Sequence, residues 1–329
     1  MNVSSVALIG VATVYGLMSG FNDGGNLLAS FTAGRVISPR LALVLLGPAV
    51  LGPLLVGTGV ARTVGISVVD LGAQGPIGFA LITLVSLFVV MVSWSLRVPT
   101  SMTLALVGAM LGWVLIDGLQ SVRWAGVARV LVGMPVSVLG GGALAWLLYR
   151  FLRLFAGNFS YAAMLSAARM QYMTAAFQSF AYGANDMEKT IGLLVVAGAF
   201  QRPGQPLIFS DLFPLLLAFA SFFLGTLLGG WRLARRVGSG VYKVSSTQGA
   251  TLQLSAATMV AGLALAGAPV STTQTIDGAR IGVGVSVRAS AVHWGLVREM
   301  LSSWLLTLPI ALLGAFAIHL VLRSLGVAP

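Results

Sequence analysis

Apolar stretches recur along the chain and are separated by short polar segments. Three examples, 77–96, 130–148 and 212–228, each have roughly the length that a helix needs to cross the hydrocarbon core of a bilayer. The first apolar run lacks a basic start and an Ala-x-Ala cleavage site, so we expect it to remain as a helix of the mature protein. The pattern predicts an all-α polytopic membrane protein with about 10–12 membrane-embedded elements, some of them broken or re-entrant.

Composition supports a membrane protein and argues against several other classes. Hydrophobic residues make up 57% of the 329 positions and charged residues 8%, whereas soluble domains carry roughly a quarter of charged residues. The net charge is +11, but the arginines stand at the ends of apolar runs, which is typical of membrane proteins and not of a nucleic-acid-binding patch. There is no cysteine, and His293 and His319 lie far apart in the sequence, so we expect no metal site built from thiolates or histidines and no cofactor.

The chain contains an internal repeat. The segments 20–26 (GFNDGGN) and 183–189 (GANDMEK) share Gly-x-Asn-Asp at a step of 163 residues. The segments 59–65 and 232–238 align at a step of 173, and PTSMTLALVGAMLG from Pro99 aligns with PVSTTQTIDGARIG from Pro269 at a step of 170. The last step also relates Gly108 to Gly278, Gly112 to Gly282, Trp124 to Trp294, and Arg153 to Arg323. We therefore expect two repeats, 1–155 and 156–329.

Duplicated transporters often pair two repeats of opposite membrane orientation, with the substrate near the midplane between them. The segment 231–236 carries three arginines, whereas its counterpart 59–63 carries one. Such a difference is expected if the two copies face opposite sides of the membrane. We predict inverted repeats with the arginine-rich copy on the cytoplasmic side.

Acidic residues inside the repeated motifs are candidates for function. An ionised carboxylate at membrane depth costs about 2.5 kcal/mol or more unless it is paired, hydrated or bound to a cation. The alternative is a structural ion pair, since Asp186 and Lys189, and likewise Asp277 and Arg280, are one helical turn apart. Recurrence of Asn-Asp in both repeats favours a cation site. Its candidate residues are Asn22, Asp23, Asn26, Asn185 and Asp186, with sodium expected at Asp23 and Asp186.

Glycines flank each Asn-Asp pair, at Gly20, Gly24, Gly25 and Gly183. Glycine allows a helix to break and to expose backbone groups, which is tolerated at membrane depth only inside the protein or along a cavity. Close helix packing is the alternative explanation, and it accounts for most of the 41 glycines. For the glycines beside Asn-Asp, we expect helix breaks.

The second pair of motifs offers hydrogen-bond donors in place of carboxylates. Hydroxyl side chains follow Pro99 and Pro269, where a helix is expected to start. A helix N-terminus presents free N–H groups and positive potential, which suit a tetrahedral oxyanion; ordinary N-capping is the alternative. The candidate anion-binding residues are Ser101, Thr103, Ser271, Thr272, Thr273 and Gln274, with Glu188, Lys189, Asp277 and Arg280 as supporting residues.

A cation site and an oxyanion site in the same halves indicate cation-coupled anion transport. Two other classes fit less well. A membrane-embedded phospholipid hydrolase would need a nucleophile and a base close together, and neither histidine lies near the motifs. An anion channel would not need carboxylates on its path. There is no nucleotide-binding P-loop, so we do not expect an ATP-driven pump or any other enzyme.

These motifs resemble those of the inorganic phosphate transporter (PiT) family. The paired signatures match 20–26 and 183–189, and the form Asn-Asp-x-x-Lys-x-x-Gly that bacterial members carry is present at 185–192. The segments 99–112, 269–284, 244–257 and 304–309 also resemble the family, so the likeness covers nearly the whole chain. It implies inverted repeats with re-entrant hairpins, in a multi-pass protein of the bacterial inner membrane that couples sodium or protons to phosphate uptake.

Four positions depart from the family pattern. Leu104 and Gln274 each stand where a histidine is usual after the Ser/Thr run. Tyr182 stands where a second histidine is usual, before the second Gly-x-Asn-Asp motif. An acid commonly found near Gln253 is absent. Without these titratable groups, we expect sodium coupling in preference to proton coupling. Phosphate is the expected substrate, sulfate or another oxyanion is the alternative, and a homodimer remains open.

Overall fold

The computed structural model describes residues 3–34, 36–95, 100–156, 161–202, 204–231, 234, 241–242 and 244–326, with backbone only at 3–5, 155–156 and 161–168. Helices and turns make up nearly all of this part, in which the β-structure is limited to an isolated bridge between Val69 and Val122. Six helical stretches within it are long and apolar enough to cross a membrane: Val6–Ala33, Pro39–Val56, Gly72–Ser95, Trp124–Leu154, Leu212–Gly230 and Trp294–Ser324. The predicted all-α polytopic membrane protein is confirmed.

The two halves share one order of elements. The first half contains α1 (Val3–Ser19), η1 (Gly20–Gly24), α2 (Gly25–Ala33), α3 (Pro39–Val44), η2 (Gly47–Val50), α4 (Leu51–Val56), α5 (Gly59–Arg62), η3 (Thr63–Ser67), η4 (Gly72–Gln74), α6 (Gly75–Ser95), α7 (Met102–Val114), η5 (Leu119–Ser121) and α8 (Trp124–Ala156). The second half contains α9 (Tyr161–Tyr182), η6 (Gly183–Met187), α10 (Glu188–Ala199), α11 (Leu212–Gly225), η7 (Thr226–Gly230), α13 (Ser246–Leu265), α14 (Thr272–Val287), η8 (Ala289–Ala291) and α15 (Trp294–Ser324).

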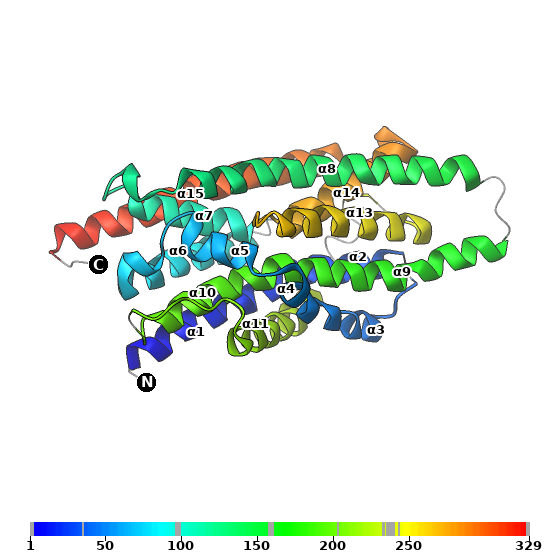
Figure 1. The fold of residues 1–329 in the computed structure, drawn as a ribbon. Helices are drawn as coiled ribbons and strands as arrows, with labels where there is room; N and C mark the ends of the chain where they lie inside the picture. Colours follow the sequence, from blue (N-terminus) through cyan, green and yellow to red (C-terminus); the bar gives the residue numbers. More distant parts are fainter. Residues whose placement is uncertain are drawn as a thin grey trace.

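Equivalent helices run in opposite directions. In Figure 1, α1 and α2 lead from the left end of the molecule to the right, whereas α9 and α10 lead from right to left. The long helices α8 and α15 are antiparallel in the same way. The repeats therefore have inverted topology, as predicted. The charge argument for orientation rested on 231–236, most of which lies outside the described residues, so the cytoplasmic side stays a prediction.

Two helical hairpins enter the molecule from its opposite ends. The pair α6 and α7 comes from the left in Figure 1, the pair α13 and α14 comes from the right, and α7 and α14 both begin near the centre. The last helix of each repeat packs on the hairpin of the other: α15 lies against α7, and α8 lies against α14. The two repeats are thus interlocked around the hairpin tips.

Glycines permit the close packing of α15 on α7 and of α8 on α14. A Cβ on Gly112 of α7 would lie 2.0 Å from the carbonyl oxygen of Leu312 in α15, and a Cβ on Gly282 of α14 would lie 2.0 Å from that of Gly142 in α8. Both the glycines and the carbonyls that they face are related by the step of 170. Backbones approach this closely only where one residue has no side chain.

The glycines of the Asn-Asp motifs also serve close packing, which corrects the expectation of helix breaks at these positions. A Cβ on Gly20 would lie 1.9 Å from the carbonyl oxygen of Phe222, and one on Gly183 would lie 1.8 Å from that of Ala49. The chain does not unwind here. It widens into the π-helical turns η1 and η6, which continue α1 into α2 and α9 into α10. Such turns are often found at functional sites because they redirect side chains without ending the helix.

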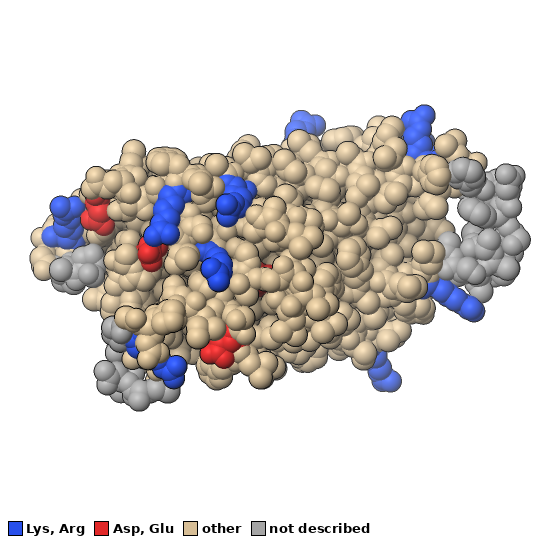
Figure 2. All heavy atoms as spheres, in the orientation of Figure 1, with Lys and Arg blue, Asp and Glu red and all other residues tan. Residues whose placement is uncertain are grey.

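The surface matches a protein that spans a bilayer. Charged side chains are sparse on the face shown in Figure 2; most lie in its left part or toward its right end, and most of the middle is uncharged. Large apolar side chains such as Leu139, Leu228 and Leu305 are more than 70% exposed in the isolated chain. Lipid would cover these side chains, which removes the cost of exposing them to water.

Candidate substrate and cation site

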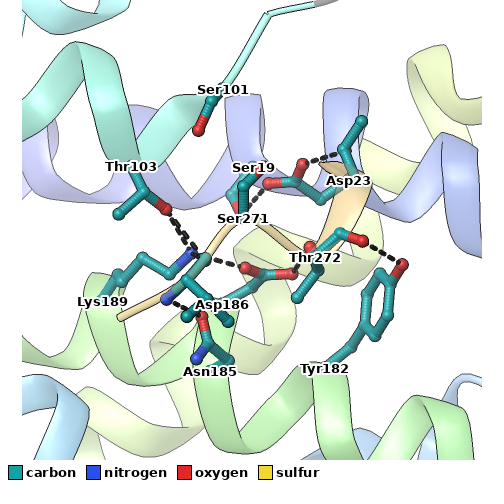
Figure 3. Close-up of polar contacts among 12 residues, drawn as sticks. Ser19, Asp23, Ser101, Thr103, Tyr182, Asn185, Asp186, Lys189, Ser271 and Thr272 are labelled. Carbon is teal, nitrogen blue, oxygen red and sulfur yellow. Dashed lines mark hydrogen bonds and ion pairs between the residues drawn. The ribbon is translucent and has the colours of Figure 1, made fainter. Parts of the chain in front are cut away.

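The candidate site lies where the starts of α7 and α14 meet η1 and η6, between the two repeats. Every predicted site residue is buried, with an exposed side-chain fraction of 7% or less. Figure 3 shows Ser101 and Ser271 of the two hairpins, Asp23 of η1, and Asp186 and Lys189 of the second repeat grouped within one close-up. The expected convergence of the motifs is therefore present.

Asp23 accepts hydrogen bonds from three neutral side chains. Its Oδ1 accepts from Asn22 Nδ2 at 2.9 Å and from Thr273 Oγ1 at 2.8 Å, and its Oδ2 accepts from Ser19 Oγ at 3.3 Å. Among the described residues, no lysine or arginine forms an ion pair with Asp23. A buried carboxylate with only neutral partners remains costly unless a cation or a proton joins it.

Asp186 has a different set of partners. Its Oδ1 accepts from Lys189 Nζ at 2.7 Å, and its Oδ2 accepts from Thr272 Oγ1 at 2.6 Å. The Lys189 ammonium also donates to Thr103 Oγ1 and to the carbonyl oxygen of Val270, both at 2.8 Å. The ion pair that the spacing of Asp186 and Lys189 allowed is formed, and it lies within the candidate site.

The contacts between motifs and hairpins cross from one repeat to the other. Asn26 and Lys189 are equivalent by the step of 163, and Thr103 and Thr273 are equivalent by the step of 170. Asn26 Nδ2 donates to Thr273 Oγ1 at 2.8 Å, just as Lys189 Nζ donates to Thr103 Oγ1. Each motif thus holds the hairpin threonine of the opposite repeat, so that movement of one repeat against the other would alter both contacts.

Asn185 binds the backbone of the second hairpin tip. Its Nδ2 donates to the carbonyl oxygen of Ala268 at 3.2 Å, and its Oδ1 accepts from the N–H of Val270 at 3.3 Å. The two bonds fix the segment that leads into Ser271. Asn185 therefore holds the hairpin tip in this conformation. The equivalent tip of the first repeat falls at 96–99, outside the described residues.

The hairpin serines are helix N-caps. Ser101 Oγ accepts from the N–H of Leu104 at 3.2 Å, and Ser271 Oγ accepts from the N–H of Gln274 at 3.4 Å. The alternative of ordinary capping is thus realised for Ser101 and Ser271. Capping uses the lone pairs of a hydroxyl, and its proton remains available to an anion. The two roles are compatible.

Three supporting residues lie outside this cluster of contacts. Glu188 Oε2 accepts from the N–H groups of Val60 and Ala61 at 2.9 and 3.1 Å, at the start of α5. Asp277 Oδ1 accepts from Arg280 Nη1 at 3.1 Å, so the second predicted ion pair is also formed, further along α14. Lys189 is the supporting residue that reaches the centre of the site.

Two site residues were not predicted from the sequence. Ser19 donates to Asp23, and Tyr182 Oη donates to the carbonyl oxygen of Thr272 at 3.1 Å. They are equivalent by the step of 163, one residue before each Gly-x-Asn-Asp motif. Extending the repeat alignment backwards by one position would have found them, although the side chains share only a hydroxyl.

The arrangement combines two kinds of chemistry at one place. Hydroxyls, helix N-termini and one ammonium can bind a tetrahedral oxyanion. Carboxylate, amide and hydroxyl oxygens can bind a hard cation. Within the described residues no three His, Asp or Glu side chains cluster to hold a metal by themselves, so a cation here would also need neutral oxygen ligands. The fold and the site define a membrane transporter of two inverted repeats, not an enzyme.

The chain belongs to the phosphate transporter family. The model of that family matches it twice, over residues 19–168 and 158–315, as a duplicated chain requires. The expected boundary between residues 155 and 156 stays a prediction. Family membership and six candidate membrane spans make this chain a multi-pass protein of the cell membrane.

Several relatives align over nearly the whole chain. A probable low-affinity inorganic phosphate transporter of Rhizobium meliloti is 31% identical over 94% of this chain and 93% of its own length. A protein of the same description from Mycobacterium tuberculosis is 32% identical over 94% of this chain and 76% of its own length. A solved structure described as the sodium-dependent phosphate transporter superposes with a TM-score of 0.82 at 20% identity, covering 97% of this chain and 99% of that one. The structural likeness concerns the fold.

Proposed function

We propose that this protein couples the entry of sodium to the uptake of inorganic phosphate, with both bound between the hairpin tips and the Asn-Asp motifs. The observation that carries the proposal is the crossed pair of contacts, Asn26 to Thr273 and Lys189 to Thr103. These contacts bring polar side chains of both repeats together at buried positions. The family of the chain supports phosphate, and its structural neighbour, a sodium-dependent phosphate transporter, supports sodium.

The anion is bound by donors that turn to it from partners within the protein: Thr103 now donates to the carbonyl oxygen of Val270, Thr272 to Asp186 and Thr273 to Asp23. Lys189 supplies a positive charge, Thr103, Thr272 and Thr273 supply hydroxyls, and Ser101 and Ser271 supply the protons that capping leaves free. Gln274 completes the predicted set, and its N–H is held by Ser271. Hydrogen bonds to a charged ligand contribute about 1.5–3 kcal/mol each, so a few of these donors suffice for binding.

The first sodium ion is bound at Asp23, whose carboxylate has only neutral partners, with Asn22 and Asn26 as neighbouring oxygen ligands. Asn26 Oδ1 is buried and has no hydrogen-bond partner, as expected of an oxygen that is a ligand of a cation. Asp186 is neutralised by Lys189 in this conformation. A second sodium joins Asp186, beside Asn185, when Lys189 turns from Asp186 to the phosphate.

Phosphate is favoured over sulfate because phosphate near neutral pH keeps a donor hydroxyl. An ionised Asp23 can accept that proton and repels sulfate, which has acceptors only. Lys189 attracts either anion, so its presence in the site relaxes the discrimination. We expect the proton of phosphate to decide, because only phosphate can donate to a carboxylate of the site.

Uptake of labelled phosphate into proteoliposomes tests the proposal. Sodium and proton gradients are imposed separately, with choline replacing sodium in the proton arm. We expect uptake with the sodium gradient and none in choline, and an excess of sulfate should leave uptake nearly unchanged. Uptake that persists in choline with a proton gradient would refute sodium coupling alone. Suppression by sulfate as strong as by unlabelled phosphate would refute the substrate.

A further inference from the structure

Polar side chains continue from the central site toward one end of the molecule. They stand at helical spacing on four helices that pack together, α2, α9, α13 and α14, and all lead toward the end at which α8 finishes, on the right in Figure 1. We call these residues the polar column. It consists of Asn26 and Ser30 on α2; Gln171, Thr174 and Gln178 on α9; Gln248 and Gln253 on α13; and Thr273, Asp277 and Arg280 on α14.

Hydrogen bonds connect the helices of the polar column: Asn26 on α2 bonds Thr273 on α14, and further bonds join α2, α9 and α13. Ser30 Oγ donates to Gln178 Oε1 at 2.7 Å, and Gln253 Nε2 donates to the carbonyl oxygen of Ser30 at 3.1 Å. Thr174 Oγ1 donates to Gln253 Oε1 at 2.5 Å. These four residues are at most 5% exposed. They form a connected buried polar network next to the site.

The network extends outward beyond Thr174. Gln171 Nε2 donates to the carbonyl oxygen of Ser246, at the start of α13. Gln248 Nε2 donates to the hydroxyls of Tyr149 and Tyr242, each at 3.2 Å. Because α13 begins near the end of the molecule, the polar column leads from the centre toward the membrane surface.

The fourth helix adds charge to the polar column. Thr273, Asp277 and Arg280 are spaced four and three residues apart, so they share one face of α14. Thr273 binds Asp23 and Asn26 of the site, and Arg280 lies about 10 Å further along the helix axis, by a rise of 1.5 Å per residue. The ion pair of Asp277 and Arg280 has an exposed fraction of 1% or less on either side chain.

The equivalent side of the first repeat is largely apolar, although the counterparts of Gln178 and Gln253 are the hydroxyl residues Tyr15 and Thr83. By the steps of 163 and 170, the counterparts of Gln171, Thr174, Ser30, Asp277 and Arg280 are Leu8, Val11, Leu193, Val107 and Met110. Leu8, Leu193, Val107 and Met110 belong to one buried hydrophobic cluster that also includes Phe79 and Val114. Inverted repeats alone would give both sides the same chemistry, so the polar column is a property of one side.

The polar column also holds buried groups with no partner. Gln178 Nε2, Gln171 Oε1 and Asn26 Oδ1 are all enclosed without a hydrogen bond. An enclosed amide without a partner costs about 1–3 kcal/mol unless water or a ligand binds it. Three such groups along one path indicate that the path contains water or substrate at some stage.

We propose that the polar column is the hydrated route between the central site and the membrane face at which α8 ends, and that Arg280 with Asp277 forms a second oxyanion site on this route. The identity of the anion as phosphate rests on the function proposed above. Arg280 presents a planar fork of donors that suits a tetrahedral oxyanion. Asp277 offsets its charge, so that an anion is bound there briefly and released.

Cysteine labelling tests the route, and the chain suits it because it contains no cysteine. Ser30→Cys places a thiol on the polar column, and Leu193→Cys places one at the equivalent position on the apolar side. A negatively charged methanethiosulfonate reagent is applied to proteoliposomes. We expect Ser30→Cys to react at least roughly ten-fold faster, since a charged reagent needs a hydrated path. Equal rates, or faster reaction of Leu193→Cys, would overturn the route. Gln178→Cys replaces Ser30→Cys if that variant fails to fold.

The second oxyanion site is tested by giving α14 the residues of α7. The double variant Asp277→Val with Arg280→Met removes both charges, and such replacements of buried ion pairs by apolar residues are often neutral for stability. We expect the maximal rate of phosphate uptake to fall roughly ten-fold while the half-saturation concentration changes little, because the central site is intact. The single variant Arg280→Lys keeps the positive charge, so its maximal rate should lie between those of the double variant and the unaltered protein. The control Val107→Ile with Met110→Leu should transport as the unaltered protein does.

The outcomes separate the two proposals. If the folded double variant transports at the unaltered rate, the ion pair is structural and the second site is refuted. If the unaltered protein takes up no phosphate, the function proposed above fails. The labelling comparison still decides the route in that case, because it measures access of the reagent and not transport.

Discussion

At the scale of single residues, the site is asymmetric although its scaffold is not. The position that is Asn26 in the first repeat is Lys189 in the second, and both contact the threonine of the opposite hairpin. One repeat therefore offers a carboxylate with neutral neighbours, and the other offers an ion pair. A cation and an anion can bind close together because each repeat supplies a different charge.

Lys189→Asn makes the two motifs alike and tests this division. We expect the half-saturation concentration for phosphate to rise roughly ten- to a hundred-fold, because a charged donor is lost. The variant also leaves Asp186 without its ion-pair partner, so Lys189→Asn combined with Asp186→Asn is measured beside it. Uptake kinetics in proteoliposomes provide the readout. An unchanged half-saturation concentration in both folded variants would place Lys189 outside the anion site.

Asp23→Asn keeps the shape of the side chain and removes its charge. The sodium concentration needed for half-maximal phosphate uptake should rise at least roughly ten-fold, since an amide lacks the charge that binds the cation. Asp70→Asn is the matched control: Asp70 pairs with Arg123 at 3.1 Å on the surface, where its side chain is 39% exposed. Sodium dependence that is the same in both variants would contradict a cation site at Asp23.

Thr273→Val removes a hydroxyl that bridges Asp23 and Asn26 at almost constant volume. The half-saturation concentration for phosphate should rise roughly ten-fold or more through the loss of a hydrogen bond to a charged ligand. Thr83→Val is the control, because the hydroxyl of Thr83 bonds the carbonyl oxygen of Phe79 within its own helix at 2.9 Å. Equal uptake kinetics of the two variants would mean that the Thr273 hydroxyl does not bind phosphate.

Much of the site could be predicted because each of its polar residues is unusual at membrane depth. Asp23, Asp186, Thr103 and Thr273 stand out against apolar neighbours and recur in both halves. Which partner each side chain takes could not be predicted. That Lys189 reaches Thr103 of the other repeat depends on how the hairpin tips meet, and no spacing within one helix contains that information.

At the scale of elements, glycine has a different role from the one predicted beside the Asn-Asp motifs. A sequence shows that a residue has no side chain, but it does not show what occupies the space. At Gly20 and Gly183 the space is taken by backbone carbonyls of Phe222 and Ala49, from elements distant in the sequence. The π-helical form of η1 and η6 was also not predicted from the sequence.

Gly282→Ala tests the crossing of α14 and α8. Its Cβ would lie 2.0 Å from the carbonyl oxygen of Gly142, so we expect a loss of about 1–3 kcal/mol in stability, seen as a lower melting temperature of the protein in detergent. Gly262→Ala in α13 is the control, because nothing lies within 4 Å of its Cβ. That variant should melt at the unaltered temperature or above it, since alanine favours a helix. Equal melting temperatures would mean that the backbones separate at little cost.

At the scale of the whole molecule, the repeats are mutually dependent. The hairpin of one half is covered by the last helix of the other, α7 by α15 and α14 by α8. The second helix of each hairpin is therefore buried mainly by the other half. The inverted arrangement was predictable from the duplicated motifs, but this exchange of last helices was not, because the sequence does not specify which copy of a helix covers which hairpin.

Separate expression of the fragments 1–155 and 156–329 tests whether the repeats depend on each other. Either fragment alone should be degraded or should bind no phosphate, because its hairpin lacks a cover. Expressed together, they should co-purify and restore measurable phosphate uptake. Co-purification is tested with an affinity tag on one fragment. Fragments that are each stable alone and do not co-purify would contradict the interlocked arrangement.

The exchanged last helices also constrain the history of the molecule. Before duplication, a protein of a single repeat could have formed this fold only as a pair of identical subunits, one inserted in each orientation, each lending its final helix to the other. Such a subunit must enter the membrane both ways with similar frequency, so its loops cannot have carried a strong charge bias. Fusion into one chain released each copy from that constraint. Thereafter the two copies were free to diverge, and they now differ in Lys189 against Asn26 and in the ion pair of α14 against apolar residues of α7.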